Sequence, residues 1–208
     1  MPRQRKPSGR KLGDRGKRLS KRRPYTRSLR QKFLIVCEGK RTEPNYFTSF
    51  RVRKDVKVQV IGEGYNTLSL VERAIELERE GKYDQAWVVF DRDDFPAQHF
   101  NEAISLAERN GIGVAYSNQA FEIWYLLHFN YHDVATSRRL YKQMLTKRLG
   151  FEYQKNDPDM YTHLQMKQAD AIRNAKKLLQ TYTSPKPERD NPSTTVHRLV
   201  EALNKFAV

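Results

Sequence analysis

Three acidic residues follow two short, continuously apolar segments of this 208-residue sequence. Glu38 comes directly after residues 33–37, and Asp91 and Asp93 come directly after residues 87–90. Short apolar runs are typical of strands buried in a parallel sheet, and ligands bind at the carboxyl ends of such strands. Alternate residues of an extended segment point the same way, so we expect Asp91 and Asp93 to converge with Glu38. Carboxylate oxygens suit a hard cation, which predicts a Mg²⁺ or Mn²⁺ site at these three acids.

Helix capping is the alternative role for part of this set. Asp93 and its neighbour Asp94 are both able to cap a helix that opens at Pro96. Capping does not account for Asp91, which directly abuts a buried strand, or for Glu38 at the end of the other strand. A metal site is therefore the favoured interpretation.

The three residues after Glu38 suit contact with a phosphate group. Gly39 lacks a side chain, so a backbone or a substrate phosphate can approach it closely. Lys40 and Arg41 place positive charge beside the expected metal site. We predict that these three residues bind phosphate, and an ordinary solvated loop is the alternative for the two cations.

Glu122 is a further candidate for the active site. It lies near the start of the aromatic segment 121–129, just after the fourth expected strand and therefore at the same edge of the sheet. Its neighbours Ile123 and Trp124 are apolar, and a carboxylate among apolar groups is costly unless it is paired or binds metal. The alternative is a favourable interaction of an acid with the first turn of a helix.

Strands and helices alternate in the part of the chain that must position these acids. Apolar runs at 33–37, 87–90 and 112–116, together with alternating valines that end at Gly62, predict four strands. Helix starts are expected at Thr42, at Asn66 or Thr67, and at Pro96. Connections of this length indicate parallel strands with right-handed crossovers, so we predict an α/β fold with a Rossmann-like parallel sheet of about four strands.

The pattern changes after Ser117 and becomes helical. Expected helices span roughly 134–149, ending at Gly150, and roughly 165–181, and a last helix starts at Asn191–Pro192 with Asn as N-cap. We therefore expect three parts: a disordered basic tail at 1–30, an α/β domain at 31–130 and a C-terminal helical extension at 131–208.

Positive charge is concentrated at the start of the chain. Residues 1–32 hold 14 Lys or Arg and one acid, while the whole chain has a formal net charge of +15. The remainder is therefore nearly neutral, and the tail is expected to bind a polyanion, most simply nucleic acid. A solvated arm that aids solubility is the alternative.

Composition also indicates the compartment. A single cysteine, Cys37, favours a reducing environment, and the basic N-terminus has no following apolar segment of a secretory signal. No window approaches eighteen consecutive apolar residues, so neither a membrane span nor a membrane partner is expected. We predict a cytoplasmic protein.

Two of the motifs above resemble the TOPRIM domain, in which an apolar strand leads to Glu-Gly-Lys and, some fifty residues on, another leads to Asp-x-Asp. The closer resemblance is to the RloB family. It is carried by segments that lie between about residues 33 and 203: Ile35–Gly39 with Thr42–Phe47, Val89–Asp93, Ser117–Asn118 with Phe121–Trp124 and Leu126–Phe129, and Asn191–Thr194.

The resemblance implies a TOPRIM fold and metal-dependent cleavage of phosphodiester bonds. Asp91 and Asp93 would then hold Mg²⁺ or Mn²⁺, and Glu38 would hold metal or act as general acid/base. Family members resemble restriction-linked and abortive-infection defence proteins that are often encoded beside an ATPase. The resemblance therefore implies an antiviral nuclease with an ATPase partner, which we expect to dock on residues 131–208.

Two other functions compete with the nuclease. One is a non-catalytic module that binds nucleic acid or the ribosome, with the acids as structural caps and the tail as the functional part. The other is an effector subunit held silent by the ATPase partner, which is compatible with nuclease activity. The sequence does not distinguish DNA from RNA as substrate.

Overall fold

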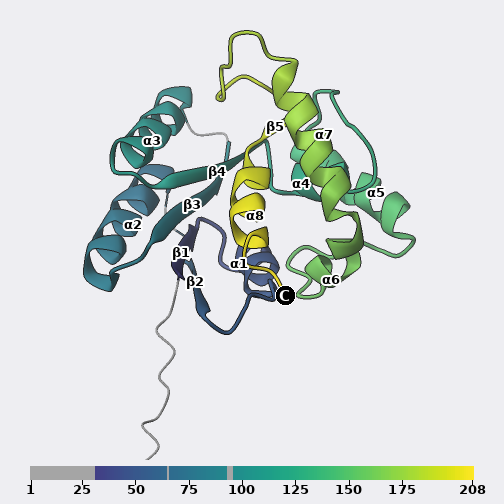
Figure 1. The fold of residues 1–208 in the computed structure, drawn as a ribbon. Coiled ribbons are helices and arrows are strands. Elements are labelled where there is room, and N and C mark those ends of the chain that lie inside the picture. The colour runs from purple at the N-terminus through teal and green to yellow at the C-terminus, as the bar shows by residue number, and fades with distance from the viewer. Residues whose placement is uncertain (1–30, 65, 93–95) are drawn as a thin grey trace, which may run out of the picture.

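The computed structural model describes residues 31–64, 66–92 and 96–208, in which a central sheet carries helices on both faces (Figure 1). The sheet has five strands in the order β2-β1-β3-β4-β5. Strands β1 to β4 are parallel, and the short β5 runs antiparallel beside β4. The strands are β1 (Gln31–Cys37), β2 (Val56–Gly62), β3 (Gln85–Asp91), β4 (Gly113–Asn118) and β5 (Ser193–Thr194).

Eight α-helices are found among the described residues, together with one 3₁₀ turn, η1 (Gln165–Lys167). They are α1 (Thr42–Thr48), α2 (Thr67–Gly81), α3 (Ala97–Arg109), α4 (Glu122–Leu127), α5 (Arg138–Leu149), α6 (Met160–Leu164), α7 (Gln168–Gln180) and α8 (Val196–Asn204).

Alternate residues of the buried strands serve two separate cores, as the two-residue period of a strand requires. Leu34 and Val36 of β1 face a core formed with α2 and α3. Phe33 and Ile35 face a larger core, to which α1 and the helices after β4 contribute. Figure 1 shows α2 and α3 on one side of the sheet and α1 and α8 on the other. The full burial of residues 33–37 of β1 explains the unbroken apolar run there.

The predicted α/β class is confirmed, with a mostly parallel sheet and a helical C-terminal part. The four parallel strands expected are all present, and Ser193 and Thr194 add the short antiparallel β5, which the sequence did not indicate. The prediction that the last helix starts at Asn191–Pro192 was wrong. The chain first pairs with β4 through β5, and α8 begins only at Val196.

The helix starts predicted from the sequence are confirmed only in part. Asn66 is the N-cap of α2, where its side chain accepts a hydrogen bond from the N–H of Ser69 at 3.1 Å. Thr42 is not a cap, since it is the first residue of α1 and donates its hydroxyl hydrogen bond to Asn156 instead. The helix expected from about 134 starts at Arg138, and Gly150 ends it in a left-handed conformation with φ of 80°.

The C-terminal residues share a core with the sheet. Leu145 of α5, Leu178 of α7 and Leu199 of α8 belong to the same hydrophobic cluster as Phe33. The boundary near residue 130 stays a prediction, and the tail at 1–30 lies outside the described residues. Within the part that the structure describes, no helix is long and apolar enough to cross a membrane.

Candidate active site

The strand order creates a crossing point at the carboxyl edge of the sheet, between β1 and β3. The chain leaves β1 through α1 toward β2 on one side, and it leaves β3 through α3 toward β4 on the other. Helices α1 and α3 pack in different cores on opposite faces, so the edge between the two strands is left open to ligands. Glu38 follows β1 and Asp91 ends β3 at this edge.

Glu38 and Asp91 are in direct contact, as the sequence predicts. Glu38 Oε2 accepts a hydrogen bond from the backbone N–H of Asp91 at 3.1 Å. Its other oxygen, Oε1, accepts one from the hydroxyl of Thr67 at 3.3 Å. Asp91 Oδ2 accepts from the N–H of Phe121 at 3.2 Å, which joins β3 to the segment before α4. These bonds fix both carboxylates at the crossing point of the sheet.

A pocket of about 630 Å³ opens beside Asp91. Among the described residues, its carboxyl groups come from three elements, namely Asp91 of β3, Glu43 of α1 and Glu122 of α4. Glu122 is half-buried, and its Oε1 accepts a hydrogen bond from the buried Tyr153 hydroxyl at 3.0 Å. The structure thus places Glu122 with Asp91 in one pocket. Glu38 does not line the pocket but adjoins it through Gly39.

Glu43 is a pocket residue that the sequence analysis missed. Only 6% of this side chain is exposed, and its Oε2 has no hydrogen-bond partner among the described residues. The carboxyl group lies directly against Gly39, where a Cβ atom would overlap with it. Burial, and then the nearby Glu122 and Glu38, raise the pKa of Glu43 to about 7. The only sequence signal was an acid in the first turn of a helix, five residues after Glu38.

The three residues predicted to bind phosphate all line this pocket. Gly39 lies against the Glu43 carboxyl, while Lys40 and Arg41 are exposed to solvent. Their position brings positive charge beside the carboxyl groups, as expected. Phosphate binding itself stays a prediction.

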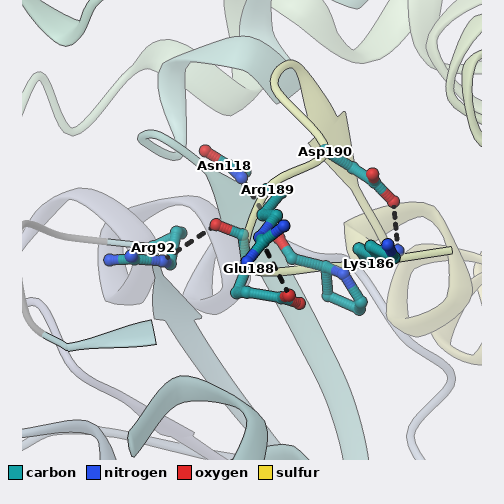
Figure 2. A network of polar contacts seen from close by, with 7 residues as sticks. Arg92, Asn118, Lys186, Glu188, Arg189 and Asp190 are labelled. Carbon is teal, nitrogen blue, oxygen red and sulfur yellow. Dashed lines mark hydrogen bonds and ion pairs between the residues drawn. The ribbon is translucent and has the colours of Figure 1, made fainter. Parts of the chain in front are cut away.

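A loop from the C-terminal part braces the ends of β3 and β4, as Figure 2 shows. Arg92 Nε donates a hydrogen bond to the carbonyl oxygen of Glu188 at 3.2 Å, and Asn118 Nδ2 donates to that of Pro187 at 3.1 Å. The loop is closed on itself by Asp190, whose carboxylate accepts from the N–H of Lys186. The side chain of the residue that follows Asp91 is therefore bound to a loop almost a hundred positions further along the chain.

Of the three predicted metal ligands, the structure describes Glu38 and Asp91, while Asp93 lies outside the described residues. Within the described ranges, no group of three or more His, Cys, Asp or Glu side chains is placed to hold a metal ion. The donors that are present fit a hard cation, since they are carboxylate oxygens and Glu43 Oε2 is buried without a hydrogen-bond partner among the described residues.

The fold and the site together define an α/β protein with a carboxylate-containing pocket at the crossing point of a mostly parallel sheet. The family model described as RloB-like protein matches residues 33–203. The chain therefore belongs to the RloB-like protein family, which confirms the resemblance seen in its motifs. A comparison with curated proteins gave no significant match.

Proposed function

We propose that this protein is a metal-dependent nuclease of the TOPRIM type that cleaves phosphodiester bonds in nucleic acid. The observation that carries the proposal is the hydrogen bond between Glu38 and the backbone of Asp91 at the crossing point of the sheet. Two acids more than fifty residues apart are thereby held together beside a pocket that also contains exposed cations. Capping alone does not require this convergence.

In this proposal Asp91 and Asp93 would hold Mg²⁺ or Mn²⁺, and Glu38 would either share that role or act as general acid/base. A divalent cation bound there would lower the pKa of water and neutralise charge on the phosphate. The N–H of Asp91 and the hydroxyl of Thr67 orient the Glu38 carboxylate, which moves a proton at the attacking water or the leaving oxygen. Lys40 and Arg41 bind the phosphate oxygens.

The test is cleavage of tRNA, rRNA, single-stranded DNA and duplex DNA in the presence of Mg²⁺ or Mn²⁺, with EDTA as the control. Glu38→Gln and Asp91→Asn remove a charge while keeping the shape and a hydrogen-bond acceptor. Glu72→Gln removes a charge from an exposed acid on α2 and serves as the matched control. We expect EDTA and the two site variants, but not Glu72→Gln, to abolish cleavage. Cleavage by both site variants at the parent's rate would refute the site.

A role in antiviral defence and an ATPase partner complete the proposal, and both rest on the family resemblance. We place the partner on the helical part, about 131–208, and the protein in the cytoplasm. Co-expression with a neighbouring ATPase followed by size-exclusion chromatography tests the complex. Separate elution at micromolar concentration would contradict a stable one. Suppression of cleavage in the complex would support the silenced-effector function.

A further inference from the structure

Four cations from the C-terminal part of the chain line the same pocket as the carboxyl groups. They are Arg138, Arg139 and Lys142 of α5 and Lys155 of the following loop, here called the basic rim. We propose that the basic rim binds consecutive phosphates of an unpaired nucleic-acid strand and leads that strand to the carboxylates. The inference rests on the proposed function and names its substrate class.

Helix α5 is fixed against the acidic part of the pocket by a buried tyrosine. Tyr141 is fully buried, and the charges of Glu122 and Asp91 contribute, after burial, to raising the pKa of its hydroxyl. At the start of the helix, the Arg138 guanidinium donates a hydrogen bond to the carbonyl oxygen of Gln119 at 3.3 Å. These two contacts hold the cations of α5 beside the carboxyl groups of the pocket.

Lys155 reaches the same place from a different segment. Its positive charge acts on the buried Glu43 carboxyl and partly offsets the effect of burial on the pKa of that group. Arg139, Lys142 and Lys155 are all exposed, so they are accessible to a ligand from solvent. The ion pair of Lys142 with Glu152 joins two side chains that are each more than half exposed. Such surface pairs are weak, so a phosphate is able to replace the carboxylate.

The balance of charge in the pocket favours a polyanion over a single small anion. Among the described residues that line it, six are cations and three are carboxyl groups. One Arg can bind a phosphate through two parallel hydrogen bonds, so six cations exceed what one phosphate requires. The excess is local, because the chain beyond residue 32 is nearly neutral. A strand with a phosphate on each nucleotide matches this arrangement.

The size of the pocket favours an unpaired strand. Its volume of about 630 Å³ lies in the range of sites that enclose a small molecule. A double helix, whose major groove alone is about 12 Å wide, does not enter such a space as a duplex. Single strands, loops and bulges present phosphates and bases that do. The predicted substrate is therefore single-stranded DNA or an unpaired region of RNA.

Binding of a fluorescent single-stranded oligonucleotide to the full chain in EDTA tests the basic rim. The triple variant Arg139→Gln, Lys142→Gln and Lys155→Gln removes three rim cations. The matched control, Lys147→Gln, Arg148→Gln and Lys205→Gln, removes three exposed cations that do not line the pocket. We expect the rim variant alone to raise the Kd at least tenfold and to flatten the slope of log K against log salt by about 2.

A second measurement does not depend on the basic tail. Cys37 is fully buried, so a cysteine introduced by Lys142→Cys or by Lys147→Cys is the accessible thiol among the described residues. We expect the single-stranded oligonucleotide to slow maleimide labelling at position 142 and not at position 147. Equal Kd for the two triple variants, together with equal labelling at both positions, would overturn the inference. Equal protection by a duplex of the same sequence would overturn the substrate class.

These outcomes are independent of catalysis. If the parent fails to cleave every substrate but the rim variant binds weakly, the nuclease proposal fails and the basic rim stands. If the parent cleaves, the two triple variants bind with equal Kd, and the cysteines at positions 142 and 147 are labelled equally, the basic rim fails and the nuclease proposal stands.

Discussion

The carboxylate of Glu38 accepts a hydrogen bond from the backbone N–H of Asp91 at 3.1 Å, which joins the carboxyl ends of β1 and β3. The two strands are paired in parallel register, with Cys37 opposite Val89. The position of Glu38 thus depends on the sheet itself and is not set by a flexible loop. This relationship gives Glu38 a structural role and a chemical role that two substitutions can separate.

We expect Glu38→Gln to keep the fold and lose activity, because glutamine retains an acceptor for the Asp91 N–H. Glu38→Ala removes the acceptor as well, and it should lower the free energy of unfolding by about 1–3 kcal/mol. Urea denaturation and initial cleavage rates distinguish the two effects. Combining Glu38→Gln with Asp91→Asn should cost little more activity than either change alone, since the two acids act as a unit. Multiplicative losses would show that they act separately.

Glu43 should make the stability of the protein depend on pH. Its pKa of about 7 in the fold lies above the ordinary 4.5, so the folded state keeps a proton that the unfolded state has lost. Stability from this group is therefore lost as pH rises from about 4.5 to 7, by up to roughly 3 kcal/mol. Glu43→Gln should remove that loss and be more stable than the parent at pH 8.

The comparison of the parent with Glu43→Gln is necessary because buried histidines act in the opposite direction. Burial lowers the pKa of His128 and of His197 to about 4, so their contribution to stability rises with pH between about 4 and 6.5. The difference between the two urea-denaturation curves, measured in EDTA at pH 5 and pH 8, isolates Glu43. A difference that does not change with pH would contradict the prediction.

Glu122 should contribute to metal binding. Glu122→Gln keeps the acceptor for the Tyr153 hydroxyl but removes the charge, so we expect weaker Mn²⁺ affinity in calorimetry and slower cleavage. Tyr153→Phe deletes the hydrogen bond and leaves the charge, and it should mainly reduce stability, by about 1 kcal/mol. If Glu122 serves only the helix dipole, Glu122→Gln will lower stability slightly while Mn²⁺ affinity and rate stay at the parent's values.

The tail at residues 1–30 should supply affinity that is independent of sequence. It holds most of the net positive charge of the chain, and binding through such charges releases counterions and weakens steeply with salt. Deleting the tail should flatten the salt dependence and weaken binding to all nucleic acids alike. Fluorescence anisotropy at several salt concentrations measures both quantities. An unchanged slope after deletion would exclude this role.

The sequence by itself determined the class of fold and the meeting of Glu38 with Asp91. Strands buried on both faces need continuous apolar runs, and runs that alternate with helices fold into a parallel sheet. The carboxyl ends of parallel strands share one edge, so residues at the ends of two such runs converge without further information. The motifs that resemble the RloB family lie on the same elements, and the match of the family model to residues 33–203 confirms the family.

Only the tertiary structure decided the rest of the pocket and the edge of the sheet. Glu43 has the local pattern of any acid in a first helical turn, and its burial arises from α1 packing against the sheet. Arg139 and Lys155 look like solvated charges in the sequence, and only the packing of α5 and of the loop after it brings them to the pocket that Asp91 lines. β5 spans two residues and has no periodicity to detect, since its partner β4 lies more than seventy residues earlier. Such contacts between distant segments depend on how complete elements pack, which local residue patterns do not encode.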